Sequence, residues 1–170
     1  ILQVQAMRRQ HGHRWISAMP TNLYGPNDNY HPENSHVLAA LIRKFHEAKT
    51  EGADTVTIWG SGSPLREFLH VDDLASAVEF LLLNYDDPQT INIGSGHEVS
   101  IQELGHTIAE VVGFDGDLVN DETKPDGTPR KMLDSSRLHS LGWTPAWGLR
   151  EGIADAYEWF LANESSVRSV

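Results

Sequence analysis

The sequence lacks several features that would assign a function directly. It contains no cysteine, which excludes disulfides, thiolate metal ligands and a cysteine nucleophile within these 170 residues. No apolar run approaches the roughly 18 residues that a membrane span needs. Lys and Arg number 13 against 24 Asp and Glu, a formal net charge of −11, whereas proteins that bind nucleic acid usually carry a basic surface. We therefore expect no nucleic-acid partner, no membrane partner and a cytoplasmic location.

Common catalytic motifs are also missing. Gly60-Ser61-Gly62 and Gly94-Ser95-Gly96 both follow expected strands, but the third position of G-x-G-x-x-G is Leu65 or Val99, so we interpret these glycines as turn residues. The nine histidines form no H-E-x-x-H, and we expect no metal site. No G-x-S-x-G marks a serine nucleophile. A hydrolase with paired carboxylates stays open, although no spacing among the 24 acidic residues singles out a pair.

What the sequence does contain is an alternation of strand-like and helix-like segments. Apolar periodicity predicts helices at residues 1–11, 36–51, 74–84, 101–112 and 149–163, followed by a frayed tail at 164–170. Start signals precede three of these helices: Asn34-Ser35 before the second, Asp72 or Asp73 before the third, and the capping box Ser100-x-x-Glu103 at the fourth. Strands are expected at 14–19, 54–60, 66–71, 89–94 and 117–121, and a loop at 122–134. This alternation predicts an α/β fold with part of a parallel sheet and a small satellite domain.

The first helix opens at Ile1 with no Ser, Thr, Asp or Asn before it as an N-cap, and it stops at Gly12. A helix without a start signal leads us to expect that the chain is cut from a longer protein.

Five basic residues stand out in so acidic a chain: Arg43, Lys44, Arg66, Arg130 and Lys131. Together they could bind a diphosphate, which needs local positive charge and directional donors. The alternative is that each is an ordinary solvated charge.

Three segments together are more specific: MPTNLYGPNDNYHPENSHV, WGSGSPLREFLHVDDLA and KPDGTPRKMLD. In this order they closely resemble the GDP-L-fucose synthases, a family of extended short-chain dehydrogenases/reductases. The resemblance runs from about residue 1 to residue 163. It implies the late elements of a Rossmann-like parallel sheet plus the small α/β substrate-binding domain of such enzymes. Residues 1–34 would end the Rossmann-like domain, and 35–170 would form mainly the substrate-binding domain, with 72–96 returning to the sheet.

The first segment carries the implied cofactor contacts and the implied acid. Pro20, Thr21, Asn22 and Leu23 match the family segment that contacts NADP(H). His36 matches the histidine that lies beside the nicotinamide and is proposed to protonate the sugar carbon during epimerisation, a role that suits imidazole near neutral pH. The alternative is that His36 merely helps to cap its helix.

The resemblance also implies substrate contacts. Lys44 matches a cation near the phosphates that is usually arginine, so the contact would lack the bidentate fork of a guanidinium. Trp59 aligns with an aromatic residue near the nucleotide, and Arg66 aligns with an arginine on the diphosphate. Asp126, Arg130 and Lys131 fall in a loop near the nucleotide end.

Two family features are absent from the sequence. Four residues after each tyrosine stand Asp28, Asn34, Gln89 and Leu161, so no Tyr-x-x-x-Lys occurs, and the glycine-rich phosphate loop is missing. We expect the C-terminal half of such an enzyme, inactive alone, with NADP(H) bound mainly by the upstream half. The complete enzyme would be a homodimer acting on a GDP-sugar, and the isolated chain would self-associate through exposed edges. Two alternatives stay open: another nucleotide-sugar epimerase/reductase, and a non-catalytic binding or assembly module.

Overall fold

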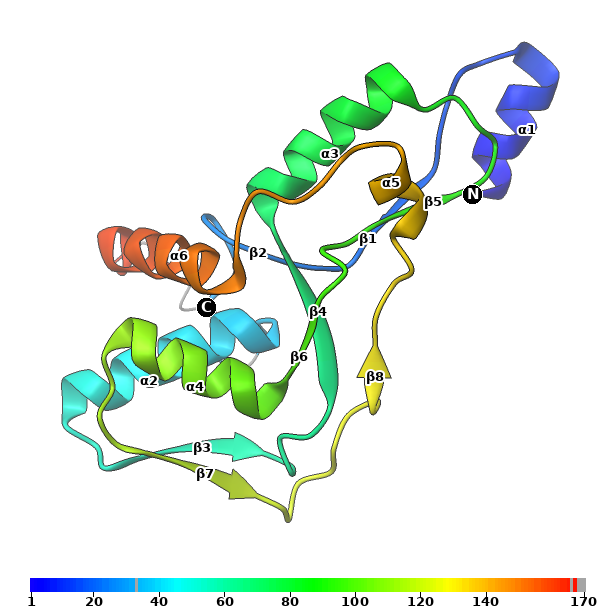
Figure 1. Cartoon of the computed structure of the whole chain (residues 1–170). Helices are drawn as coiled ribbons and strands as arrows, with labels where there is room; N and C mark the ends of the chain where they lie inside the picture. The colour runs from blue at the N-terminus through cyan, green and yellow to red at the C-terminus, as the bar shows by residue number, and fades with distance from the viewer. Residues whose placement is uncertain (33, 166, 168–170) are drawn as a thin grey trace.

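Strand β4 (Leu65–His70) occupies the centre of the computed structural model, which describes residues 1–32, 34–165 and 167 (Figure 1). It pairs in parallel with β2 (Asn22–Tyr24), antiparallel with β6 (Glu98–Ser100) and in parallel with β8 (Arg130–Lys131). The sequence predicted none of these three partners, because each strand has only two or three residues. A strand that short shows no readable alternation.

Two further parallel ladders flank this centre. Strand β1 (Ala18–Pro20) pairs with β5 (Ile91–Ile93), and β3 (Thr55–Trp59) pairs with β7 (Asp117–Asp121). The expected α/β fold with parallel strands is therefore confirmed. The first strand is shorter than expected, since only its last two predicted residues and Pro20 are paired.

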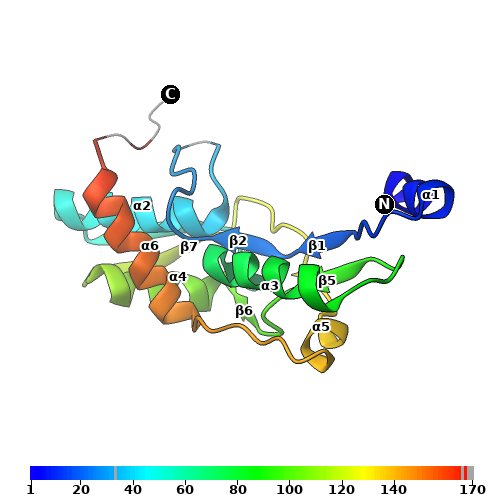
Figure 2. The same cartoon turned by 90° about the horizontal axis from the view of Figure 1, so that it is seen from above.

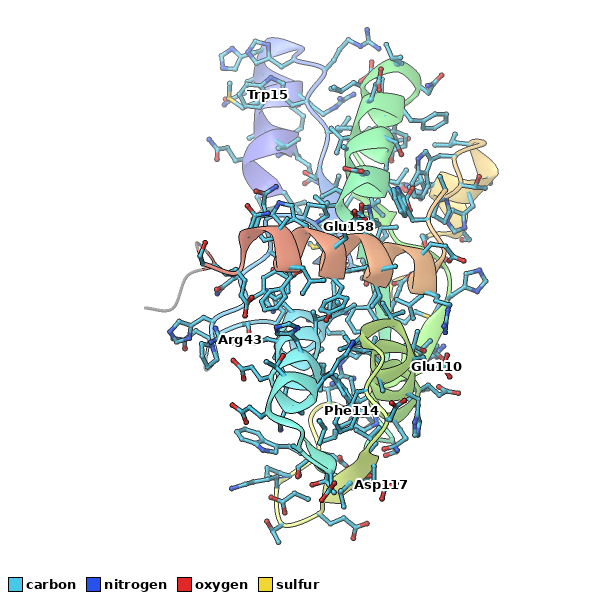
Figure 3. All side chains as sticks on the ribbon, turned by 90° about the vertical axis from the view of Figure 1, so that its left-hand side faces the viewer. Trp15, Arg43, Glu110, Phe114, Asp117 and Glu158 are labelled. Carbon is cyan, nitrogen blue, oxygen red and sulfur yellow. The ribbon has the colours of Figure 1, made fainter. Side chains whose placement is uncertain are left out.

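Three helices enclose the larger of two hydrophobic clusters: α2 (Val37–Glu51), α4 (Ile101–Val112) and α6 (Leu149–Asn163). Phe45 of α2 meets Phe114 edge to face with ring centroids 5.5 Å apart, and Figure 3 shows Phe114 beside the ends of α2 and α4. Tyr30 is buried against α6, where its hydroxyl donates to the carbonyl of Ala156 at 3.1 Å. The loop before α2 is thus tied to the last helix.

The smaller cluster joins the β1–β5 ladder to α3 (Val71–Asn84) and α5 (Ser136–Ser140). Its buried members include Leu81, Ile93, Leu138 and Trp143. Helix α1 (Leu2–His11) buries no residue and projects at one end of the molecule, as Figure 2 shows.

The helix starts differ from the expected ones in two cases. Helix α2 begins one residue after His36, so the predicted Asn34-Ser35 cap was wrong. The cap of α3 is the imidazole of His70, which accepts from the N–H of Asp72, so the expected Asp caps lie in the first turn instead. Helix α4 has the predicted capping box, with Ser100 and Glu103 each bonded to the other's backbone N–H.

Two remaining predictions concern single features. Gly12 ends α1 in the left-handed conformation, with φ 66°, as expected. The expected frayed tail includes residues 166 and 168–170, which lie outside the described part of the chain. Within the described part, no helix is both long enough and apolar enough to span a membrane.

Candidate functional site

The predicted cofactor segment lies where β1 leaves β5 and β2 joins β4. Pro20 ends β1 and is exposed, and the N–H of Thr21 donates to the carbonyl of Ile93 at 2.9 Å. The side chains of Thr21 and Asn22 both donate to the carbonyl of Glu67, at 3.3 and 2.7 Å. Leu23 packs against the smaller cluster. The carboxyl ends of parallel strands are where α/β sheets bind ligands, and Pro20 stands at such an end.

His36 is the N-cap residue of α2, and its side chain is free to act elsewhere. Its backbone is extended, with φ −72° and ψ 156°, and its imidazole makes no capping hydrogen bond. The side chain is exposed. The alternative that His36 serves through side-chain capping therefore has no support in this geometry.

The polar loop before His36 is held mainly by its own side chains. Asp28 accepts from the N–H of Asn29 at 2.6 Å, and the Asn29 amide donates to the carbonyl of Asn34 at 2.9 Å. Burial raises the pKa of the Asp28 carboxyl, while the Asn29 N–H and the charge of His36 oppose that rise. Oδ2 of Asp28 and Oγ of Ser35 are buried and have no hydrogen-bond partner among the described residues. Much of this polar stretch therefore shapes the loop that presents His36.

Lys44, Trp59 and Asp126 gather around the ends of β3 and β7. Nζ of Lys44 donates to the carbonyl of Thr57, and partial burial lowers the pKa of this ammonium. Trp59 is 70% exposed, and the ammonium of Lys124 lies 5.6 Å from its ring centroid. The carboxylate of Asp126 accepts from the N–H and the hydroxyl of Ser61, at 2.9 and 2.7 Å. An exposed aromatic face beside cations suits a nucleotide base next to phosphates.

Arg66 and Lys131 are direct neighbours on β4 and β8. The ladder places them opposite each other, so their side chains leave the same face of the sheet. The Arg66 guanidinium donates to the carbonyls of Leu65 and Thr128, both at 2.7 Å. The structure therefore brings these two predicted cations together.

Arg130 lies apart from that pair. It stands opposite Leu65, on the other face, and its Nε donates to the Glu98 carboxylate at 2.8 Å. Arg130 also lines a separate cavity of about 450 Å³ with Gly96, Leu133 and His139. Arg43, labelled near the start of α2 in Figure 3, is bound to Glu47 and to the carbonyl of Tyr30.

A second cavity, of about 330 Å³, opens on the Arg66 face of β4. Its walls include the rings of Tyr24, Phe68, His70 and Trp147. His70 is buried, stacks on Trp147 at 4.3 Å and lies 3.2 Å from the carboxylate of Asp155. Burial raises the pKa of the Tyr24 phenol, with the nearby carboxylates adding to that effect. Within the described residues, no group of three or more His, Asp or Glu could hold a metal ion.

Comparison with known sequences decides the family. Residues 1–94 match the NAD dependent epimerase/dehydratase family. The chain belongs to this family.

Several relatives of this chain are named as GDP-sugar enzymes. GDP-L-fucose synthase 1 of Arabidopsis thaliana is 65% identical over 94% of this chain and 49% of its own length. GDP-L-fucose synthase of Escherichia coli K12 is 50% identical over 96% of this chain and 54% of its own length. The crystal structure of a GDP-L-fucose synthetase from Naegleria fowleri bound to NADP has a TM-score of 0.84 and 32% identity, covering 91% of this chain and 49% of that one. The chain spans about half the length of these relatives, and it matches their C-terminal portion.

Sequence reasoning missed three kinds of residue at this site. Glu67 and His70 are buried and hydrogen-bonded to other segments of the chain. Both lie within a segment that carries the family resemblance, but no role was predicted for either of them. The contact between the Lys124 ammonium and the Trp59 ring was also not predicted. The local pattern gives no clear signal for Glu67, because half of the β4 residues, LREFLH, are polar or charged.

Proposed function

We propose that this chain supplies the substrate-binding part and the epimerisation acid of a GDP-L-fucose synthase. The complete enzyme would convert GDP-4-keto-6-deoxy-D-mannose to GDP-L-fucose by epimerisation at C3 and C5 and NADPH-dependent reduction at C4. The observation that carries the proposal is the meeting of β2 and β4. There, hydrogen bonds from Thr21 and Asn22 to the carbonyl of Glu67 bring the cofactor segment beside Arg66.

The substrate would lie between His36 and the basic residues. Arg66 and Lys131 share one face and would bind the diphosphate, and Trp59 would support the guanine. Lys44 and Asp126 would hold the surrounding segments through Thr57 and Ser61. Arg130 lies on the opposite face, so it would contact the nucleotide only at the edge of the site.

His36 would act on the sugar ring. Protons at C3 and C5 are acidic because they flank the C4 ketone, and each epimerisation needs a proton returned to the opposite face of the carbon. We assign that donation to a ring nitrogen of His36, whose side chain is exposed and not used in capping.

The cofactor residues present fit only part of NADP(H). Pro20 offers an exposed strand end and residues 21–23 are half-buried, which suits the nicotinamide side, while no glycine-rich phosphate loop occurs in the sequence. NADPH, when bound, would supply the hydride for the C4 ketone. We propose that the upstream half of the enzyme binds most of the cofactor.

The division into two parts follows the two hydrophobic clusters. We propose that the smaller cluster, with β1, β5 and α3, belongs to the cofactor domain, and that the larger cluster belongs to the substrate domain. In the complete enzyme the upstream half would cover the exposed β1, and the whole would form a homodimer.

Activity of two proteins tests this proposal: the chain alone, and the chain joined to the N-terminal half of the Arabidopsis relative. We expect no NADPH consumption by the chain alone and turnover by the joined protein. Calorimetry on the joined protein should show tighter binding of GDP than of UDP or dTDP. Turnover by the chain alone would contradict the division of labour, and a preference for UDP would contradict the substrate.

The role of His36 has its own test in the joined protein. His36→Asn should slow deuterium incorporation from solvent at C3 and C5 by about 10²- to 10⁴-fold, the usual contribution of general acid catalysis. Ketone reduction should fall less. His106→Asn, an exposed histidine of α4, is the matched control and should leave exchange unchanged. Deuterium exchange by His36→Asn at the wild-type rate would remove His36 as the acid.

A further inference from the structure

Glu67 is a buried carboxylate that the proposed reaction does not use. It lies in the middle of β4 with no measurable exposure. Among the described residues, none forms an ion pair with it. A buried charge without a cation needs strong hydrogen bonds, since its desolvation is otherwise uncompensated.

Those hydrogen bonds come from the backbone of two distant segments. Oε1 accepts from the N–H of Gly96 at 2.8 Å, in the turn after β5. Oε2 accepts from the N–H of Leu133 at 3.2 Å, two residues beyond the end of β8. A Cβ placed on Gly94 would touch the same carboxylate, so a glycine leaves the room that the carboxylate needs. The side chain of Glu67 thus joins the turn after β5 to the segment that carries Lys131.

The backbone of Glu67 makes the third connection. Its carbonyl accepts from Thr21 and Asn22, as described above. This hydrogen bond uses one N–H of the Asn22 amide and leaves its second N–H and its Oδ1 for other partners. One residue therefore contacts the cofactor segment, the turn after β5 and the segment after β8.

This contact adds to other bonds of the β8 region, such as the hydrogen bond from the Asn92 amide to the carbonyl of Asp134 at 2.9 Å. β8 has two residues and pairs only with β4 in the described structure, where it places Lys131 opposite Arg66. The Glu67–Leu133 hydrogen bond extends that attachment beyond the ladder. Without it, Lys131 would keep its charge and its ladder pairing with Arg66, but the chain directly after it would be held less firmly.

We propose that Glu67 is a positioning residue that holds the cofactor segment and the Lys131 strand in one arrangement for GDP-sugar binding. The inference rests on the proposed function, because it assigns Glu67 a role through residues placed at that site. Glu67 itself would not contact the reacting atoms.

Glu67→Gln in the joined protein is the direct test. The amide has the same shape but can accept at only one position, and its NH2 would oppose the other backbone N–H. Loss of one hydrogen bond to a charged group should raise the KM for the GDP-sugar by about 10- to 100-fold, with a smaller change in kcat.

Asp73→Asn is the matched control. Asp73 is also a buried carboxylate, and it also accepts two backbone N–H groups, those of Ala146 at 2.8 Å and Trp147 at 3.1 Å. Its loss should destabilise the fold to a similar degree but change the KM much less than Glu67→Gln does, because Asp73 contacts neither the cofactor segment nor the segment after β8. A role of Glu67 in stability alone would give the two variants the same kinetics.

Gly94→Ala keeps the proposal testable if Glu67→Gln folds poorly. It retains the charge and pushes the carboxylate from its two N–H donors, so the KM should rise by a smaller factor. In the 170-residue chain, Glu67→Gln should also speed hydrogen exchange at the Gly96 and Leu133 amides, and Asp73→Asn should not.

The outcomes separate the inference from the proposed function. An inactive joined protein overturns both. An active joined protein in which both Glu67→Gln and Gly94→Ala keep the wild-type KM overturns the positioning role alone, as does unchanged exchange at Gly96 and Leu133. A KM effect shared by Asp73→Asn reduces Glu67 to a stabilising residue and also overturns it.

Discussion

The two ends of this molecule differ in how completely their apolar surfaces are covered. Around α2, α4 and α6 most of the large apolar side chains are buried, and Phe45 has no exposed surface. Around α1, α3 and β1, by contrast, Leu2, Leu82 and Leu83 are 71–80% exposed, and all three residues of β1 are open. Parallel strands normally lie between neighbours and are covered on both faces. The difference indicates that one end has a well-covered core, whereas the other end leaves apolar side chains exposed.

Truncating one apolar side chain at each end gives the largest contrast. Phe45→Ala should lower the free energy of unfolding by about 3–5 kcal/mol, because it removes a buried ring and leaves a cavity. Leu82→Ala should change it by less than about 0.5 kcal/mol. Urea unfolding followed by circular dichroism measures both. Equal losses for the two variants would mean that the α3 face is covered in solution.

Self-association tests the open end directly. We expect the isolated chain to associate through the exposed face of α3, so Leu82→Glu with Leu83→Glu should weaken association about tenfold or more, roughly 1.4 kcal/mol. Leu161→Glu is the control, since this α6 residue is 46% exposed but lies at the covered end. Light scattering over a concentration series gives the result. A wild-type chain that stays monomeric contradicts the prediction.

The starts of α4 and α2 show the same contrast on a smaller scale. Ser100 and Glu103 form a complete capping box at α4, whereas the buried hydroxyl of Ser35 before α2 has no partner within the part of the chain that the structure describes. Ser100→Ala should cost about 0.5–2 kcal/mol of stability. Ser35→Ala should be neutral or slightly stabilising, because it removes an unsatisfied polar group. Urea titration compares the two, and a large loss for Ser35→Ala would show that its hydroxyl has a partner in solution.

Asp28 gives the smallest effect, a dependence of stability on pH. Burial raises the pKa of its carboxyl, so the folded chain holds this proton more tightly than the unfolded chain. Stability should therefore fall as pH rises from the ordinary Asp range through the raised pKa. Asp28→Asn should remove that part of the slope, and the exposed Asp115→Asn should not. Unfolding free energies at several pH values test this, and identical slopes for wild type and Asp28→Asn would contradict it.

The helices and longer strands were predictable because local pattern determines them. The capping box at Ser100, the glycine stop at Gly12 and the strands at 55–59 and 117–121 all follow from neighbouring residues. The starts of α2 and α3 could not be predicted from local pattern, because histidines at 36 and 70 occupy cap positions that Ser, Asp or Asn usually take.

The sequence by itself determined the α/β class, the family and the identity of the candidate site residues, because periodicity and motif order are properties of neighbouring residues. Tertiary structure alone decided which of those residues meet. It paired Arg66 with Lys131, turned Arg130 to the opposite face, and joined three distant segments at Glu67. The physical reason is that two-residue strands and buried carboxylates are stabilised by partners far away in the chain, and no local pattern encodes those partners.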